Sequence, residues 1–169
     1  MADAPASGTA RDFLTADLFD DHAERLQVAA AGLLDYGARR RFHGQIATVR
    51  AYEDNSRVRE AVGSGGEGRV LVVDGGGSLR RAMLGDMLAR LAVENGWRGV
   101  VINGCIRDSV AIGRMPLGVK ALGTVPAKTD KHGQGLVDVP VTFAGVTFTP
   151  GAWLYADGDG IVVAEAALA

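Results

Sequence analysis

The middle of the chain has two long apolar runs with an amphipathic segment between them. The run "RVLVVDGGG" at 69–77 is typical of a strand that is buried on both faces and ends in a glycine-rich loop. Residues 78–97 place apolar side chains three and four positions apart, and Gly96 stands where a C-terminal cap belongs, so they predict a helix. The run "RGVVINGCI" at 98–106 predicts a second buried strand. This order favours a right-handed βαβ unit with parallel strands.

The flanking segments complete an α/β pattern. Residues 15–27 predict a helix with Thr15 as its N-cap. Residues 43–52 predict a strand, and residues 56–68 predict a short helix that glycines interrupt. In the last third of the chain, "LGVKALGTVP" and the runs between 137 and 163 are short, β-branched and separated by glycine and proline. We therefore expect one α/β domain with a parallel part and an appended, more antiparallel β layer.

The composition is that of a soluble globular domain. The chain has 169 residues, of which 47% are hydrophobic and 22% charged, and its net charge of −2 indicates neither a nucleic-acid nor a membrane surface. Residues 1–10 are small and polar and are expected to be disordered, which leaves residues 11–169 as a single domain. The single cysteine, Cys105, excludes an internal disulfide framework. Without a secretory leader or an apolar run of roughly 20 residues, a cytoplasmic location is expected.

Several motif-like features favour structural interpretations. "GSGGEG" at 63–68 matches G-x-G-x-x-G, but it precedes a strand instead of joining a strand to a helix, so we expect a flexible turn. "DGDG" at 157–160 resembles the start of a calcium loop but lacks its further acidic ligands, which favours a tight turn between strands. Cys105 lies among apolar residues and is expected to be buried. The three histidines show no metal-ligand spacing.

The first candidate functional feature is "LGDML" at 84–88, within the segment of helical spacing. A glycine in a helix interior costs about 1 kcal/mol relative to alanine. If the helix breaks at Gly85 and begins again at Asp86, the backbone N–H groups at 86–88 are free to bind an anion. Alternatively, Gly85 only allows close packing or a kink. The pattern leaves both interpretations open.

The second candidate feature is the pair Arg107–Asp108, at the carboxyl end of the second buried strand. Ligands of parallel sheets bind beyond the carboxyl ends of the strands. Arginine presents a planar fork suited to a carboxylate, and aspartate offers oxygen ligands to Mg²⁺ or a similar cation. Because neighbours on an extended chain point to opposite faces, each side chain is expected to have its own partner. A small anionic ligand with a metal and an ordinary surface pair both fit the pattern.

Several separated blocks of the chain resemble one protein family. They are "FHGQIATVRAYEDN", the segment from "VLVVDGGG" to "INGCIRD", "PLGVKALGTVP" and "VTFAGVTFTPGAWLYADGDGIVV". Over roughly residues 15–165, their order and spacing resemble the family of regulator of ribonuclease activity A and the 4-hydroxy-4-methyl-2-oxoglutarate aldolases. The resemblance implies a three-layer β/β/α swivelling-type domain, with a parallel central sheet and a second, more antiparallel β layer. It also implies assembly as a homotrimer or hexamer.

The resemblance carries expectations about the site. Aldolase members hold a divalent metal, Mg²⁺ or Mn²⁺, at an aspartate matched by Asp108 and bind substrate through an arginine matched by Arg107. They also bind substrate with a loop, which is matched here by Gly85, Asp86, Met87 and Leu88. The implied activity is retro-aldol cleavage of 4-hydroxy-4-methyl-2-oxoglutarate to pyruvate, with oxaloacetate decarboxylation as a side activity and Arg107 and Asp86 as catalytic residues. One departure is Ala111, where the aldolase pattern has a second acidic residue.

The resemblance also implies an alternative function, a regulator that binds and inhibits ribonuclease E without chemistry. Members known chiefly as regulators can lack the aspartates of "GD" and "RD", and this chain keeps both, so the aldolase interpretation is favoured. Asp86 and a metal-bound water are both candidates for the base that removes the hydroxyl proton. The physiological substrate and pathway are left open.

Overall fold

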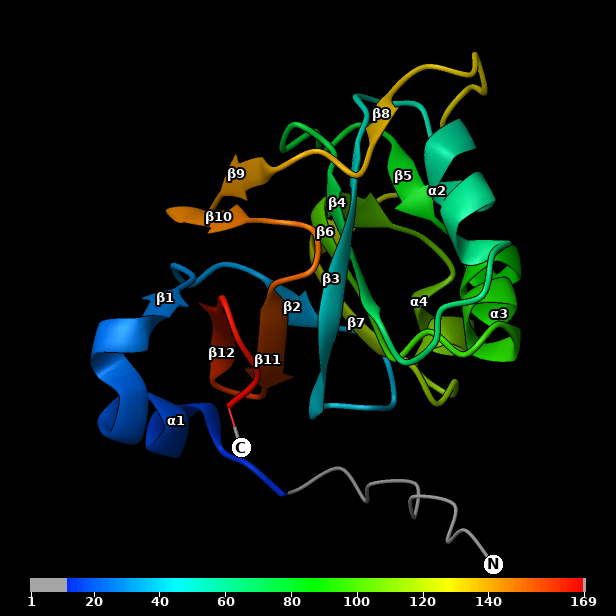
Figure 1. Cartoon of the computed structure of the whole chain (residues 1–169). Coiled ribbons are helices and arrows are strands. Elements are labelled where there is room, and N and C mark those ends of the chain that lie inside the picture. The colour runs from blue at the N-terminus through cyan, green and yellow to red at the C-terminus, as the bar shows by residue number, and fades with distance from the viewer. Residues whose placement is uncertain (1–11, 169) are drawn as a thin grey trace, which may run out of the picture.

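A parallel sheet lies at the centre of the fold. In the computed structural model, which describes residues 12–168, four parallel strands lie side by side in the order β3 (Phe42–Arg50), β4 (Val70–Asp74), β6 (Gly99–Ile106) and β7 (Gly118–Thr124) (Figure 1). The short strand β5 (Ala82–Leu84) also runs parallel to β6, and β2 (Leu34–Asp35) pairs antiparallel with β7 at the edge. The parallel pairing of β4 and β6 confirms that part of the strand–helix–strand prediction.

One strand lies in a different layer from the one predicted. β7 comes from "LGVKALGTVP", which was assigned to the antiparallel part, and that assignment is wrong because β7 extends the parallel sheet. Residues 118–121 are all buried, since β7 lies between β6 and β2 and is covered on both faces. The glycines and the buried lysine of β7 interrupt the apolar run, so the sequence pattern does not indicate a strand buried on both faces.

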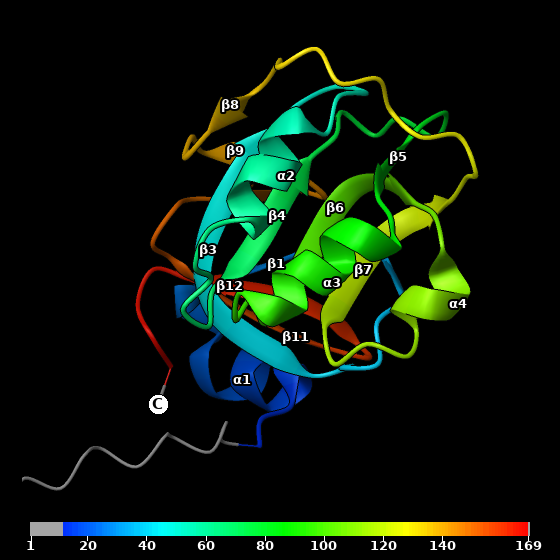
Figure 2. The same ribbon diagram turned by 90° about the vertical axis from the view of Figure 1, so that its right-hand side faces the viewer.

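Helices cover one face of the parallel sheet. Figure 2 shows α2 (Ser56–Val62) and α3 (Asp86–Glu94) in front of the strands, with α4 (Ser109–Ile112) beside them. Side chains alternate along a strand, so every second residue points to the helices. Leu71 and Val73 of β4 and Val100 and Ile102 of β6 therefore share a buried cluster with Ala89 of α3.

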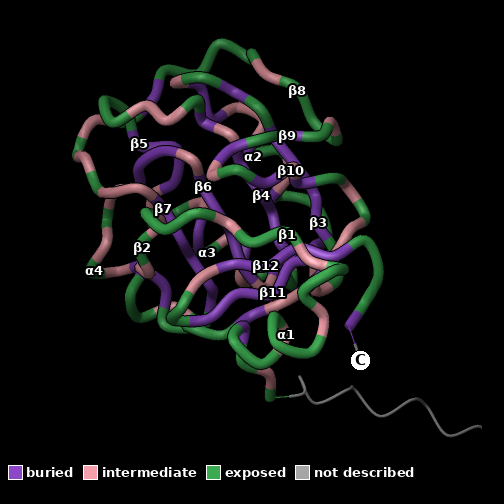
Figure 3. Tube along the Cα trace, turned by 90° about the vertical axis from the view of Figure 1, so that its left-hand side faces the viewer, coloured by how far each residue is buried: buried purple, intermediate pink, exposed green. Residues whose placement is uncertain are grey.

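A second β layer covers the other face. It contains the hairpin of β9 (Val141–Phe143) and β10 (Val146–Phe148) and the hairpin of β11 (Trp153–Asp157) and β12 (Gly160–Ala164), with β1 (Leu26–Val28) paired to β12. The alternate side chains of the central strands pack against it in a second buried cluster that includes Ile46, Val70, Val72 and Val101. In Figure 3 the central strands are mostly buried and the connecting loops exposed.

Strand β3 joins the two β layers. Its first half, residues 42–45, pairs antiparallel with β11, and its second half, residues 46–50, pairs parallel with β4. The short β8 (Leu136–Val137) pairs antiparallel with the far end of β3. This arrangement confirms the predicted three-layer β/β/α fold. The hairpin β11–β12 with β1 is connected to the parallel strands in one ten-stranded sheet, whereas β9 and β10 form a separate two-stranded sheet. The turn between β11 and β12 confirms the interpretation of "DGDG".

The first helix begins differently from the prediction. α1 (Thr15–His22) and the 3-10 turn η1 (Ala23–Arg25) follow Leu14, which occupies the N-cap position predicted for Thr15. The Thr15 N–H donates to Asp157 Oδ2 at 2.7 Å, and its hydroxyl donates to Asp157 Oδ1 at 2.6 Å. A carboxylate of β11 thus satisfies a helix N–H group that a local cap would otherwise serve.

The segment 78–97 is part strand and part helix, so the helical prediction is wrong before Gly85 and the interpretation with a helix start at Asp86 is confirmed. β5 ends at Leu84 and α3 begins at Asp86, while Gly96 follows the helix at φ +80 as predicted for a C-terminal cap. The apolar spacing before Gly85 fits a buried strand as well as a helix, because Leu84 is fully buried at the end of β5.

Residues 1–10, which are expected to be disordered, lie outside the described residues. Among residues 12–168, no helix is long and apolar enough to cross a membrane.

Candidate functional site

A pocket of about 340 Å³ lies where β5, β6, α2 and α3 meet. Every candidate site residue from the sequence borders it, although these residues come from two separate segments. Its lining residues are Asn55, Arg59, Ala82, Gly85, Asp86, Met87, Leu88, Arg90, Leu91, Glu94, Arg107, Asp108, Lys128 and Lys131. The fold therefore brings the "GD" and "RD" motifs into one cavity.

Gly85 separates β5 from α3 and lies directly beside Asp108. Its backbone is extended, with φ −125 and ψ −171, and the helix begins at the next residue. A Cβ atom at Gly85 would lie 2.8 Å from Asp108 Oδ2 and 3.3 Å from Arg107 Nε, closer than side-chain contacts normally allow. The helix begins at Asp86, so the first interpretation of Gly85 is confirmed, and the absent side chain lets Asp108 approach closely as well.

Asp108 turns back toward the start of α3. It adopts the left-handed conformation, with φ 55 and ψ 39, and its Oδ2 accepts a hydrogen bond from the Asp86 N–H at 2.9 Å. The same oxygen lies 3.9 Å from Arg107 Nε. The expectation that neighbouring Arg107 and Asp108 point apart is wrong, because the left-handed residue ends the extended strand. Of the three N–H groups predicted to be free, that of Asp86 is occupied, and those of Met87 and Leu88 are left without an intrahelical partner.

The donor set of the pocket fits Mg²⁺ or Mn²⁺ only with water and substrate as further ligands. No group of three or more His, Cys, Asp or Glu side chains that could hold a metal occurs among residues 12–168. Mg²⁺ commonly uses one or two protein carboxylates and keeps several waters. The partly exposed carboxylate of Asp108 can serve as such a ligand, and the Asp86 carboxylate borders the same space. Ala111, in α4, adds no oxygen ligand.

The pocket has an excess of positive charge. Five cationic side chains line it, those of Arg59, Arg90, Arg107, Lys128 and Lys131. Three carboxylates oppose them, those of Asp86, Glu94 and Asp108. An electropositive cavity favours an anionic ligand. Of the five cations, sequence reasoning identified only Arg107, because the others lie on α2, on α3 or in the loop after β7 and carry no motif.

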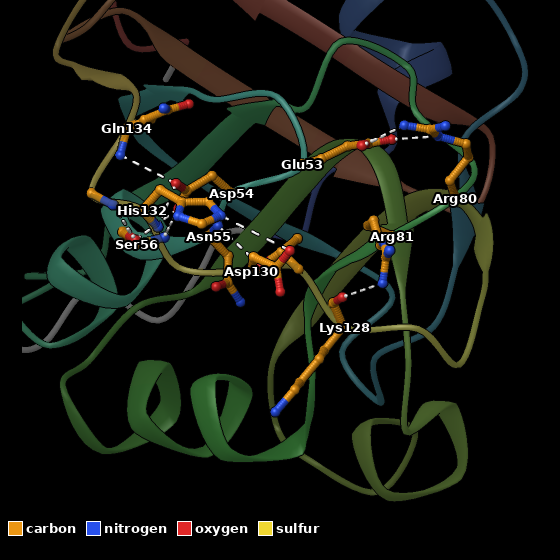
Figure 4. A network of polar contacts seen from close by, with 12 residues as sticks. Glu53, Asp54, Asn55, Ser56, Arg80, Arg81, Lys128, Asp130, His132 and Gln134 are labelled. Carbon is orange, nitrogen blue, oxygen red and sulfur yellow. Dashed lines mark hydrogen bonds and ion pairs between the residues drawn. The ribbon is translucent and has the colours of Figure 1, made fainter.

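A network of hydrogen bonds around Asp54 lies next to the pocket residue Asn55 (Figure 4). The buried Asp54 carboxylate accepts hydrogen bonds from the Ser56 N–H and hydroxyl at 2.9 and 2.7 Å, the His132 N–H at 2.8 Å and the Gln134 N–H at 3.2 Å. Burial raises the pKa of Asp54, but these hydrogen bonds outweigh it and lower the pKa to about 2. The ionised carboxylate therefore ties the loop after β7 to the start of α2.

Asn55, next to this network, is a pocket residue that sequence reasoning missed. Its N–H donates to Thr129 Oγ1 at 3.2 Å, and its Nδ2 donates to the Met83 carbonyl at 3.3 Å. Its Oδ1 is buried and has no hydrogen-bond partner among the described residues. Buried polar atoms are normally paired, so an unpaired oxygen in a pocket wall indicates a place for a ligand or a water. No sequence signal distinguishes Asn55 from an ordinary helix-start asparagine.

The sequence and the fold of the chain can be compared with those of known proteins. A family model for RraA-like proteins, described as Aldolase/RraA, matches residues 15–163. The chain belongs to the RraA-like family. This RraA-like chain is 60% identical over 151 residues, 89% of its length and 95% of the relative's, to a Laribacter hongkongensis protein named "Putative 4-hydroxy-4-methyl-2-oxoglutarate aldolase". It is 53% identical to a Pseudomonas aeruginosa protein of the same name, over 92% of this chain and 96% of the relative.

Two solved structures share the fold of this RraA-like chain closely. One, from Geobacillus kaustophilus, is described as an S-adenosylmethionine: 2-dimethylmenaquinone methyltransferase, with a TM-score of 0.91, 53% identity and coverage of 92% of this chain and 97% of that one. The other is described as the RNA-processing inhibitor RraA from Thermus thermophilis, with a TM-score of 0.90, 42% identity and coverage of 94% and 96%. These descriptions name different activities, so the function must be argued from the pocket.

Proposed function

We propose that this RraA-like chain is a divalent-metal-dependent lyase that cleaves 4-hydroxy-4-methyl-2-oxoglutarate to pyruvate by a retro-aldol reaction. The observation that carries this proposal is that the N-terminus of α3, Arg107 and Asp108 border one electropositive pocket. The names of relatives with 60% and 53% identity support the same reaction. Residues Gly85, Asp86, Met87 and Leu88 and Arg107 are assigned to substrate binding, and Asp108 is assigned to the metal.

The residues of this chain bind and orient the 2-oxo acid end of the substrate. Arg107 presents two N–H groups to the carboxylate, and the N–H groups of Met87 and Leu88 add the positive end of α3. These groups oppose the negative charge that develops as the carbon–carbon bond breaks. A Mg²⁺ or Mn²⁺ ion held by Asp108 would supply Lewis-acid stabilisation of that charge.

Cleavage requires that a proton leave the substrate hydroxyl. We assign this proton to the Asp86 carboxylate, which borders the pocket at the start of α3. The bond between C3 and C4 then breaks, and its electron pair moves to the 2-oxo group. The C4 fragment leaves as pyruvate, and protonation of the enolate at C3 gives the second pyruvate. Oxaloacetate yields the same enolate on losing CO₂, so decarboxylation is an expected side activity.

A coupled assay of pyruvate release tests this function. We expect turnover that requires Mg²⁺ or Mn²⁺, is abolished by EDTA and falls by about 100-fold or more in Asp108→Ala, since a lost metal ligand removes most of the charge stabilisation. Asp17→Ala, at an exposed residue of α1 that does not line the pocket, is the matched control and should retain activity. Full turnover in Asp108→Ala contradicts the metal role.

The same assay separates the lyase from the alternative regulator. The similarity to the protein described as an RNA-processing inhibitor supports a regulator that binds ribonuclease E. If the purified chain binds ribonuclease E tightly and releases no pyruvate from 2-oxo acids with either metal, the regulator is the function. If the chain releases pyruvate and does not bind ribonuclease E, the result supports the lyase and contradicts the regulator.

A further inference from the structure

A second cavity, of about 720 Å³, lies at the amino ends of the parallel strands. It is lined by Phe42 at the start of β3, Arg98 before β6 and Pro116 before β7. The pocket of Arg107 and Asp108 lies beyond the opposite, carboxyl end of β6. The two cavities share no lining residue, so the second one takes no part in the proposed reaction.

Three arginines from separate segments give this cavity an excess of positive charge. They are Arg39 and Arg41, in the loop before β3, and Arg98. Among the described residues that line the cavity, Asp12 is the one carboxylate, and it pairs with Arg41 at 2.9 Å. Within residues 12–168, no ion pair joins Arg39 or Arg98 to a carboxylate. Two unopposed guanidinium groups in one cavity favour a ligand with two negative charges.

Backbone hydrogen bonds fix the positions of Arg39 and Arg98. The Arg98 N–H donates to the Arg69 carbonyl at 3.0 Å, and the Arg98 carbonyl accepts the Gly118 N–H at 3.0 Å. The Arg39 N–H donates to the Leu117 carbonyl at 3.3 Å. Both side chains therefore extend from backbone that is already ordered, which lowers the cost of binding an anion between them.

Four aromatic rings also line the cavity, those of Phe13, Phe42, His43 and Trp97. The rings of Phe13 and His43 meet edge to face with their centroids 5.6 Å apart. The His43 ring also stacks on Tyr155 at 5.5 Å, which holds the imidazole in place. Phe, His and Trp side chains are the surfaces on which proteins stack planar rings such as nucleobases.

His43 adds a polar group to this aromatic lining without adding charge. Burial lowers the pKa of His43, and the nearby Arg98 guanidinium lowers it further, so the imidazole is neutral at pH 7. A neutral imidazole has one nitrogen that donates and one that accepts a hydrogen bond. It can therefore pair with the polar edge of a planar ring.

We propose that this cavity binds a phosphate ester that carries a planar ring, of the class of the nucleoside monophosphates. Arg39 and Arg98 bind the phosphate with their planar forks, while Phe13 and His43 contact the ring. The volume lies within the range of about 300–1,000 Å³ that is usual for small-molecule sites. This site is independent of the proposed lyase reaction, because it uses none of the residues assigned to that reaction.

Calorimetric titration with adenosine 5′-monophosphate, ribose 5-phosphate and adenosine tests the site. The first ligand carries both the phosphate and the ring, and each of the others lacks one of them. We expect the nucleotide to bind at least about tenfold more tightly than either fragment. Arg98→Gln and Arg39→Gln should each weaken nucleotide binding by about tenfold, the scale of one charge-assisted contact. Arg39 is exposed, so Arg39→Gln keeps the test decisive if Arg98→Gln does not fold.

Two further variants are the controls. Arg114→Gln removes the same charge from an exposed turn outside both cavities and should keep the wild-type Kd. Arg107→Gln tests the other electropositive pocket and should keep it as well. A loss of nucleotide affinity in Arg107→Gln alone overturns the site, as does a wild-type protein that does not bind the nucleotide. Equal affinities for the nucleotide and ribose 5-phosphate show that the ring is not recognised and also contradict the proposal.

Discussion

Asp108 meets several structural demands at once. Its left-handed backbone ends β6, its Oδ2 accepts the first N–H of α3, and the same oxygen lies 3.9 Å from Arg107 Nε. Aspartate tolerates this conformation better than most residues, and unusual backbone geometry outside glycine often occurs at functional sites. The conformation places a carboxylate and a guanidinium from neighbouring residues on the same side of the strand.

The fork of Arg107 should be essential for binding the substrate carboxylate. We expect Arg107→Lys to lower kcat/KM for 4-hydroxy-4-methyl-2-oxoglutarate by about 10- to 100-fold, since lysine cannot donate two parallel hydrogen bonds. Steady-state kinetics measure this change. Arg114→Lys, on an exposed turn after α4, should have little effect, and equal losses in both variants would contradict the assignment.

Gly85 should tolerate no side chain without loss of activity. The Cβ of Gly85→Ala would lie 2.8 Å from Asp108 Oδ2, so the carboxylate must move and its bond to the Asp86 N–H weakens. We expect about a tenfold or greater loss of kcat, in line with the effect of small misplacements in active sites. Gly65→Ala has open space around its Cβ and should leave turnover unchanged. Normal turnover in Gly85→Ala would show that the Asp108 position is not critical.

At the scale of elements, the loop after β7 is ordered by contacts with α2. Asp54 accepts the His132 and Gln134 N–H groups, and Arg57 donates to the Gly133 carbonyl at 2.7 Å and the Gly135 carbonyl at 3.3 Å. These contacts fix the part of the chain that follows Lys128. A loop without regular structure thus has a defined place beside the pocket.

This loop should loosen in acid. Hydrogen bonds to Asp54 lower its pKa in the folded protein to about 2, below the usual pKa of an aspartate. Its ionised form therefore stabilises the fold above about pH 4, and this contribution is lost as the pH falls toward 2. The shift corresponds to about 2 kcal/mol, which solvent around the exposed loop reduces to about 1 kcal/mol. We expect Asp54→Asn to lower the free energy of unfolding in urea by that amount at pH 7 and by less at pH 3.

Asp130→Asn is the control for this measurement. The Asp130 carboxylate is exposed and lies 3.9 Å from His132 Nε2. Its replacement should change the free energy of unfolding little at either pH. A difference between wild type and Asp54→Asn that stays constant from pH 7 to pH 3 would contradict the role of the ionised Asp54.

At the scale of the whole molecule, apolar side chains are exposed near the pocket. Met87 is 77% and Val110 is 70% exposed, and both lie within two residues of a candidate site aspartate. Ala111 also leaves the pocket without the second acidic residue of the aldolase pattern. A neighbouring copy of the chain could cover these side chains and contribute a carboxylate, in keeping with the expected homotrimer or hexamer.

The assembly can be measured directly. We expect light scattering after size-exclusion chromatography to give about three or six times the 17.6 kDa of one chain, because burial of exposed apolar surface favours association. Val110→Asp should shift the distribution toward smaller species and reduce activity with it. A fully active 17.6 kDa monomer would contradict the proposed assembly.

The local sequence pattern determined a large part of this protein. Unbroken apolar runs at 70–73 and 99–102 indicated strands covered on both faces, and the fold confirms them. The rule that ligands lie at the carboxyl ends of parallel strands directed attention to Arg107 and Asp108, and Gly85 indicated a helix start as one of two open interpretations. The strand predictions succeed because burial on both faces leaves an unbroken apolar run in the chain, and the assignment of Arg107 and Asp108 to a ligand stays a prediction.

Only the tertiary structure decided how the pocket is completed. The left-handed turn of Asp108, the Asp157 partner of Thr15 and the parallel direction of β7 all depend on contacts between distant segments. Lys128 and Asn55 reach the pocket because both are tied to β5, through backbone pairing and a single side-chain hydrogen bond. Such contacts follow from the packing of the layers and have no period along the chain, so no local pattern encodes them.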